Sequence, residues 1–103
     1  MLIMLEARFP VDCANELAAS GKLGKTIQAI LDEQKPESVY FLDRDGDRTA
    51  ILVVDVKNAA GLPALAEPWM QALEASIEMH PVMTAADLAK AEPDIKRIAK
   101  RFG

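Results

Sequence analysis

The chain has 103 residues, 50% of them hydrophobic, and a formal net charge of −4 at pH 7. This length suffices for one compact core but not for two, so we expect a single domain over residues 1–103. No stretch approaches the roughly 20 consecutive apolar residues of a membrane-spanning helix, and the acidic balance disfavours nucleic acid as the main partner, because phosphate-backbone binding needs many Lys and Arg contacts.

Residues 2–8 predict the first strand, because small or apolar residues alternate there at the period of two that a strand requires. The alternation puts Ile3, Leu5 and Ala7 on one face. Asp12 follows the strand, and we expect it to be the N-cap of the first helix.

The first helix is predicted from about Cys13 to Gln34, with a break in its middle. Gly21 and Gly24 each cost about 1 kcal/mol relative to Ala inside a helix, so we expect a bend or break between Ser20 and Gly24. Cys13 is the single cysteine and has no partner for an intramolecular disulfide. We interpret it as a small helical hydrophobe rather than a catalytic thiol.

A β-hairpin is predicted from about Glu37 to Val56. Its two strands are rich in aromatic and β-branched residues, and Asp45-Gly46 supplies the positive φ angles of a tight two-residue turn. The turn divides the chain into two halves of the same order, strand, helix and strand. This order is the strongest indication of the fold.

The second half predicts a turn and a helix start over residues 58–63, a helix that continues over residues 64–75, and a fourth strand over residues 76–82. Pro68 is tolerated if it lies near the first turn of a helix that begins late. Trp69 on this helix is interpreted as a core or interface anchor rather than a cofactor platform.

Residues 84–103 are predicted to form a helical extension. Thr84 and Asp87 have the spacing of a capping box, which predicts a short helix from Ala85 to about Ala91. After Pro93, apolar residues recur at helical spacing and indicate a further amphipathic segment. These residues are Ile95, Ile98, Ala99 and Phe102.

The charge is unevenly spread, because residues 1–95 carry −8 and the remaining residues carry +4. Cations at a helix C-terminus offset the macrodipole and are common there. An acidic surface or RNA remains an alternative partner for this basic end.

The order βαββαβ is that of the ferredoxin-like fold, an α+β fold in which an antiparallel four-stranded sheet carries both helices on one side. The other face of the sheet is then uncovered. Its predicted residues are too apolar for contact with water, and exposed patches of that kind usually mark an interface. They are Met4, Tyr40, Leu42, Ala50 or Ile51, and Val82.

In element order, in length and in the strand-to-helix segment Glu78–Thr84, the chain resembles the dimeric α/β-barrel superfamily. This superfamily includes muconolactone isomerase-like proteins, antibiotic-biosynthesis-type monooxygenases and uncharacterised small bacterial proteins. The resemblance implies a homodimer in which two sheets close face to face around a small cavity. It does not determine the function, because one fold hosts many functions.

The uncovered face also carries candidate catalytic residues. Glu78 and His80 share one face of the fourth strand, and Glu6 lies on the first strand, its neighbour in a ferredoxin-like sheet. A histidine beside a carboxylate can act as a general acid or base. The candidate catalytic set is therefore His80, Glu78 and Glu6.

Three further residues are candidates for ligand binding on the same face. Arg8 can hold an anionic or carbonyl-bearing group through its planar fork, Tyr40 supplies a hydroxyl, and Met4 supplies apolar surface. In the alternative interpretation, Arg8 joins Glu6, Glu78 and His80 in an ion-pair network that only fixes the register of a dimer interface.

No metal or cofactor is expected. His80 is the only histidine, which argues against a site built from several His or Cys ligands. Asp43, Asp45 and Asp47 are spaced as in a calcium loop, but its required Gly and Glu are absent. Haem-degrading members of the superfamily use an Asn, a Trp and a His, and the first strand here has no Asn.

Gly24-Lys25-Thr26 matches the end of a phosphate-binding loop. That loop also needs a Gly where this chain has Ala19, and it follows a strand, whereas here a helix precedes it. Nucleotide binding is therefore not predicted.

The sequence thus favours a cytoplasmic homodimer that binds a small organic ligand between its two sheets. The cytoplasmic location is expected from the single cysteine and the absence of a signal peptide. A cofactor-independent isomerase or monooxygenase-like enzyme with His80 as acid or base is the second possibility. A regulatory subunit that docks through its C-terminal helix is the third.

Overall fold

The structure is a computed structural model that describes residues 1–103. Its elements follow in the order β1 (Leu2–Arg8), α1 (Val11–Ala19), α2 (Leu23–Gln34), β2 (Ser38–Arg44), β3 (Asp47–Asp55), α3 (Gly61–Leu73), β4 (Ser76–Pro81) and α4 (Ala85–Phe102). None of the four helices combines the length and the apolar content needed to cross a bilayer.

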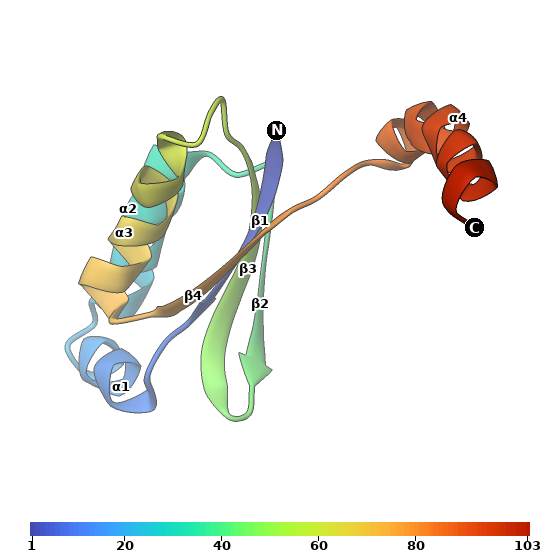
Figure 1. The fold of residues 1–103 in the computed structure, drawn as a ribbon. Helices are drawn as coiled ribbons and strands as arrows, with labels where there is room; N and C mark the ends of the chain where they lie inside the picture. Colours follow the sequence, from blue (N-terminus) through green and yellow to red (C-terminus); the bar gives the residue numbers. More distant parts are fainter.

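The four strands form one antiparallel sheet in the order β2-β3-β1-β4. Helices α1, α2 and α3 lie together on one side of it (Figure 1). This arrangement is the ferredoxin-like fold, so the predicted α+β class is confirmed. The register places Glu6 opposite both Ile51 of β3 and Glu78 of β4, which makes β1 and β4 neighbours as predicted.

The hydrophobic core lies between the sheet and the three helices. The predicted alternation of β1 is confirmed, because Ile3, Leu5 and Ala7 are all buried against the helix layer. Trp69 of α3 is fully buried there, and its ring stacks on Phe9 with 5.8 Å between centroids. Trp69 is therefore a core anchor, as expected.

The predicted break in the first helix is confirmed, and it separates α1 from α2. Gly21 has a φ angle of +73° in the connecting turn, a conformation that glycine adopts without steric cost. The prediction of Asp12 as N-cap is wrong. Pro10 occupies that position, and no side chain caps the helix. Asp12 lies in the first turn of α1, where its negative charge interacts favourably with the positive end of the helix dipole.

The hairpin prediction is confirmed, with Asp45 at φ +51° and Gly46 at φ +89°. Its strands reach the turn on both sides, because Arg44 and Asp47 pair across it.

Helix α3 begins at Gly61, within the predicted turn and helix start of residues 58–63, so the possible placement of Pro68 near its first turn is wrong. The side-chain oxygen of Asn58 accepts a hydrogen bond from the Ala60 N–H at 3.0 Å, and its carbonyl accepts from the Gly61 N–H at 3.0 Å. These bonds satisfy amides at the helix start. Pro68 lies inside the helix, where the carbonyl that loses its partner belongs to the exposed Ala64.

Helix α4 is one continuous element, so the predicted end near Ala91 is wrong. The capping box is confirmed, because Thr84 and Asp87 exchange side-chain to backbone hydrogen bonds of 3.0 and 3.1 Å. Pro93 lies within the helix and removes a single backbone donor on an exposed face. An ion pair from Glu92 to Lys96 spans Pro93, and one from Asp94 to Arg97 follows it.

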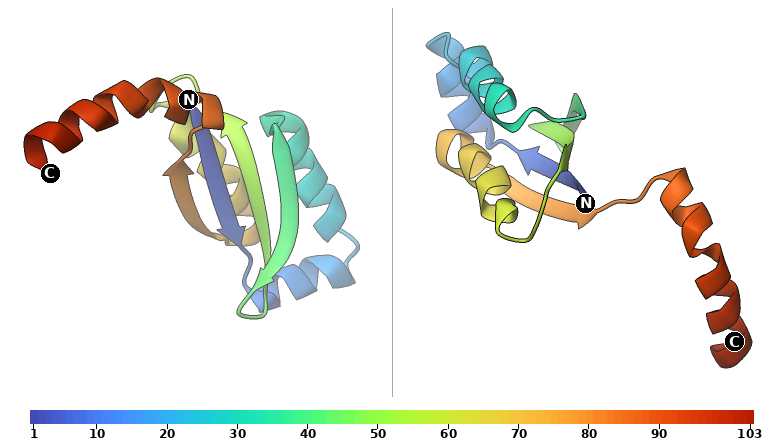
Figure 2. Two further views of the ribbon diagram at one scale, coloured as in Figure 1. Left: turned by 90° about the vertical axis from the view of Figure 1, so that its right-hand side faces the viewer. Right: turned by 90° about the horizontal axis from the view of Figure 1, so that it is seen from above.

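Helix α4 stands apart from the rest of the molecule. It contains no buried residue, and an extended segment after β4 carries it to the side of the sheet opposite α1, α2 and α3 (Figures 1 and 2). The molecule is consequently elongated, with extents of 59 × 28 × 20 Å.

Candidate functional site

The side of the sheet away from α1, α2 and α3 is bare of helices in this chain, and we call it the open face (Figure 2, left). Strand alternation and register place these residues on it: Met4, Glu6, Arg8, Tyr40, Leu42, Arg44, Thr49, Ile51, Val53, Glu78 and His80. All six predicted site residues are thus on the open face. Of the alternatives Ala50 and Ile51, it is Ile51 that lies there, whereas Ala50 is fully buried under the helices.

An apolar centre occupies the middle of the open face, and we define it as Met4, Leu42, Ile51 and Val53. These side chains are half-buried although no element covers them, because neighbouring side chains on the pleated sheet shield one another. Tyr40 lies beside Ile51 in the register and is 70% exposed. An apolar surface with a phenol at its margin can hold an apolar molecule that carries a hydrogen-bonding group.

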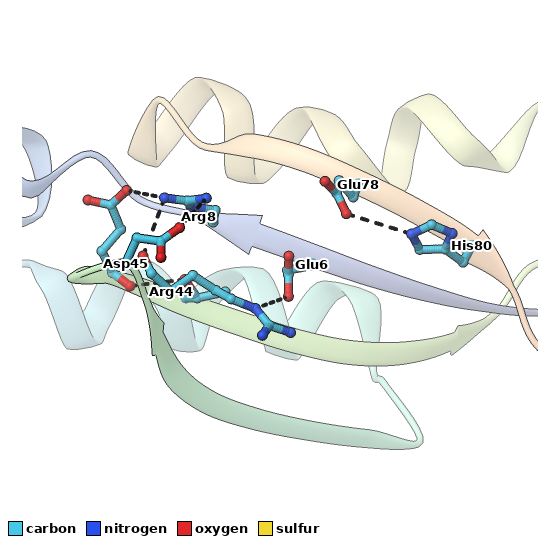
Figure 3. A network of polar contacts seen from close by, with 8 residues as sticks. Glu6, Arg8, Arg44, Asp45, Glu78 and His80 are labelled. Carbon is cyan, nitrogen blue, oxygen red and sulfur yellow. Dashed lines mark hydrogen bonds and ion pairs between the residues drawn. The ribbon is translucent and has the colours of Figure 1, made fainter.

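Arg8 lies at the hairpin end of the open face and contacts the turn (Figure 3). Its Nη2 donates to Asp47 Oδ2 at 2.9 Å and to the Arg44 carbonyl at 3.3 Å, and its Nη1 is 3.7 Å from Asp45 Oδ2. The hydrogen bond to Asp47 is the main reason that the pKa of Arg8 is raised above its ordinary value. Arg8 is therefore a fixed cation.

Glu6 is held by Arg44, a residue that the sequence interpretation did not single out. Arg44 Nε donates to Glu6 Oε1 at 2.8 Å, and the Glu6 side chain is only 14% exposed. Arg44 directly precedes the predicted two-residue turn. The alternation that places Tyr40 and Leu42 on the uncovered face, extended by two residues, places Arg44 there as well.

Glu78 and His80 form a separate pair on β4. His80 Nε2 is 3.7 Å from Glu78 Oε2, and both side chains are more than half exposed, His80 at 58% and Glu78 at 71% (Figure 3). His80 is the register partner of Met4, so it borders the apolar centre. The four polar residues of the predicted network thus divide into two groups, with Arg8 and Glu6 bound to hairpin residues and His80 bound to Glu78.

Two other features lie away from the open face. The Cys13 thiol is half-buried on α1, and burial is the main reason that its pKa is raised, so it stays protonated and weakly nucleophilic at neutral pH. A cavity of about 500 Å³ lies where the ends of α2 and β3 meet the start of α3, and Gln34, Val56 and Leu65 are among its lining residues. None of the predicted site residues lines it. No cluster of three or more His, Cys, Asp or Glu side chains is placed to hold a metal ion.

Comparison with known proteins gives a family and a small set of similar structures. A family model described as "Domain of unknown function (DUF3303)" matches residues 1–96. No curated protein matches the chain.

Solved structures of similar fold include three with 12–19% identity to this chain. The de novo designed protein Ferredog-Diesel has 12% identity and a TM-score of 0.46, covering 79% of this chain and 85% of that chain. A formyltetrahydrofolate deformylase from Pseudomonas putida KT2440 has 19% identity and a TM-score of 0.49, covering 80% of this chain and 29% of the deformylase. Rv0793 from Mycobacterium tuberculosis has 14% identity and a TM-score of 0.48, covering 82% of this chain and 99% of that chain.

Proposed function

The chain belongs to the family described as a domain of unknown function (DUF3303), and for this member we propose that two copies pack their open faces together as a dimeric α/β barrel that binds a small organic ligand between the sheets. The observation that carries the proposal is the apolar centre of the open face. It is the one large face of the sheet that no element of the chain covers.

The physical argument starts from the composition of that face. In a sheet with one face in water, the residues that point to that face are normally polar. Here Met4, Ile51 and Val53 instead form a continuous apolar surface. Stacked sheets lie about 10 Å apart. A second copy at that spacing would remove the apolar centre from water, and the curvature of two twisted sheets would leave room between them.

The proposed ligand has an apolar body and at least one polar group. The apolar centre would contact the body, and polar side chains at its margin would orient it. Tyr40 and His80 are more than half exposed and free to turn towards a ligand. Arg8 retains N–H donors beyond those that its Nη2 gives to Asp47 and Arg44, and it would contact a carbonyl or anionic group.

The test has two parts, dimerisation and pocket formation. Ile51→Arg places a charge in the apolar centre, so we expect it to convert the dimer into a monomer in sedimentation velocity at micromolar concentration. Gln28→Arg adds the same charge on exposed α2 and should leave the dimer intact. Val53→Trp fills the pocket, so we expect the saturable fluorescence enhancement of 1-anilinonaphthalene-8-sulfonate to disappear.

A wild-type chain that sediments as a monomer, or an Ile51→Arg variant that dimerises normally, would contradict the shared sheet interface. Unchanged probe binding in the Val53→Trp variant would contradict the pocket.

The Glu78 and His80 pair favours a second function, cofactor-independent proton transfer on a small carbonyl compound. A carboxylate 3.7 Å from the imidazole can orient it as an acid or base beside the apolar centre. Glu6 accepts a hydrogen bond from Arg44, so it would remain a carboxylate. Its role would be to place a negative charge beside Glu78 rather than to transfer a proton.

We expect His80→Ala to lower the rate of deuterium incorporation from D₂O into acetylacetone, followed by NMR, to the rate measured without protein, and to leave the melting temperature unchanged. Ser76→Ala on the same strand is the control and should retain the rate. If exchange is equal in both variants, or if His80→Ala mainly destabilises the fold, the pair is structural.

A further inference from the structure

Helix α4 carries apolar side chains that nothing in the chain covers. Leu88 is 52% exposed, Ile95 50%, Ile98 45% and Phe102 73%, and none of the 18 residues of α4 is buried. Helices in proteins gain most of their stability by packing an apolar face, and Pro93 inside α4 lowers the stability that this helix has by itself. The helix therefore needs a partner.

The spacing of these side chains identifies the kind of partner. Together with Ala91 they follow one another at intervals of three, four, three and four residues, and we call this set the α4 seam: Leu88, Ala91, Ile95, Ile98 and Phe102. This is the a/d pattern of a coiled coil. A helix that packs on a globular body usually has a wider apolar face, and a strict a/d stripe is the narrower contact between two helices.

The seam is free of interruption. Pro93 and the cation Lys100 lie at the positions furthest from it on the helix, so the missing N–H of Pro93 is on the solvent side. Charged residues flank the seam, with Asp87, Asp94 and Arg101 on one side and Glu92 on the other. This is the usual arrangement of a helix that pairs with another helix.

We infer that α4 pairs along its seam with α4 of a second copy of this chain. Helices α1, α2 and α3 already pack against the sheet, so α4 is the helix of this protein with an unoccupied seam, and a symmetric dimer brings two such seams together. Figure 1 shows α4 displaced to the side of the open face, where the proposed second copy lies. The inference rests in part on the proposed homodimer.

The flanking charges favour an antiparallel pair. If the two helices ran parallel, Asp87 would face Glu92 of the partner subunit, and like charges in that position repel. In the antiparallel arrangement that matches Ile95 with Ala91 of the partner subunit, Asp87 lies near Arg101 of the partner subunit. The two-fold symmetry makes this attraction occur twice.

Two like-charge contacts remain near the two-fold axis of the antiparallel pair. Asp94 lies near Asp94 of the partner subunit, and Glu92 lies near Glu92 of the partner subunit. Both carboxylates already have a cation on the same helix. Asp94 lies 3.7 Å from Arg97, and Glu92 lies 3.4 Å from Lys96. These cations reduce the repulsion at the axis. In the parallel pair Lys96 likewise neutralises Glu92, but Asp87 has no ion-pair partner on its own helix and loses the attraction to Arg101 of the partner subunit.

The α4 pair has a consequence for the open face. Strand β4, which carries Glu78 and His80, is joined to α4 by only three residues, Val82 to Thr84. Pairing of the helices would hold the two sheets at a high effective concentration and strengthen the shared interface without a new sheet contact.

The test compares variants of the full chain by sedimentation equilibrium. Ile95→Ser with Ile98→Ser removes four apolar side chains from the dimer, so we expect the dissociation constant to rise by about 100-fold or more. Ala86→Ser with Ala89→Ser introduces the same residues on the opposite face of α4 and should change it less than about threefold. All four positions are exposed in one copy, so the core is unaffected.

A second pair of variants tests the orientation. Arg101→Glu should weaken the dimer by about tenfold, because it turns an attraction to Asp87 of the partner subunit into a repulsion. Lys100→Glu makes the same charge change in the same helical turn but points away from the seam, and should have little effect. Hydrogen exchange of the α4 amides should also slow as the protein concentration rises.

The outcomes separate this inference from the proposed function. If the serine seam variant dimerises as tightly as wild type and the α4 amides exchange fast at every concentration, the helix pairing is wrong while the sheet interface stands. If the seam variant is monomeric but Ile51→Arg dimerises normally, the helix pairing stands and the shared pocket is wrong. Equal effects of Arg101→Glu and Lys100→Glu would overturn the antiparallel orientation.

Discussion

Trp69 links the helix layer to the sheet through contacts of two kinds. Its ring stacks on Phe9, and its Nε1 donates to Gln34 Oε1 at 3.0 Å, while Gln34 Nε2 donates to the Leu65 carbonyl at 2.8 Å. The indole N–H, which would be costly to bury without an acceptor, is therefore satisfied. One side chain thus ties α2, α3 and the end of β1 together.

We expect Trp69→Ala to lower the free energy of unfolding by about 3–5 kcal/mol, because it leaves a cavity in the core and an unpaired Gln34 amide. Urea denaturation followed by circular dichroism measures this without needing the lost fluorophore. Met70→Ala, at the next and 44% exposed position, is the matched control and should cost less than about 1 kcal/mol. Similar losses in both variants would mean that Trp69 is not the anchor of the core.

For the candidate site residues, the face of the sheet was predictable but the binding partners were not. Met4, Glu6, Arg8, Tyr40 and His80 were placed on the correct face because strand alternation has a fixed period of two. The partners of the charged residues were not predictable. Arg44 reaches Glu6 only because β2 and β1 flank β3 in the folded sheet, and no local pattern encodes that proximity.

At the scale of elements, the hairpin is the part of the fold that local chemistry determines most completely. Asp45 and Gly46 both have positive φ angles, which a two-residue turn of matching twist requires. The loop between α1 and α2 uses Gly21 in the same way. Gly24, by contrast, lies inside α2 without a positive φ, and a methyl group added at its Cα would meet no atom within 4 Å.

Gly46 and Gly24 therefore predict opposite effects of the same substitution. Gly46→Ala should destabilise the protein by roughly 1–2 kcal/mol, because a Cβ strains the left-handed conformation. Gly24→Ala should stabilise it by roughly 0.5–1 kcal/mol, because Ala loses less entropy in a helix. Thermal and urea unfolding of both variants check the prediction. A loss of stability in Gly24→Ala would show that this glycine has a packing role.

Proline positions were the least predictable elements. Pro68 and Pro93 were both expected near helix boundaries, yet each lies within a continuous helix. A proline inside a helix costs about 3 kcal/mol. The core packing of α3 offsets this cost, whereas α4 has only its capping box and two ion pairs within this chain. Local propensity alone therefore ended the first part of α4 too early.

At the scale of the whole molecule, the shape argues for association. The radius of gyration is 17.3 Å, whereas a compact chain of about 100 residues has one of about 13 Å. The difference arises from α4, which extends away from the body. One copy thus leaves two apolar surfaces uncovered, the centre of the open face and the α4 seam.

The net charge differs in sign between the body of the molecule and its C-terminal helix. Residues 1–84 contain seven Lys and Arg residues against thirteen Asp and Glu residues, a net charge of −6, whereas residues 85–103 contain five against three, a net charge of +2. Two acidic bodies repel each other, and the cationic helices reduce that repulsion when both copies come together. The basic end thus has a use that does not require nucleic acid.

The amino-acid sequence by itself determined the element order, the hairpin turn, the break between α1 and α2, the capping box and the faces of the strands. Each of these follows from interactions between residues only a few positions apart. The tertiary structure alone decided that Arg44 binds Glu6, that α3 and α4 continue through their prolines, and that α4 has no partner within the chain. These outcomes depend on contacts between residues far apart in the sequence, which local periodicity does not encode.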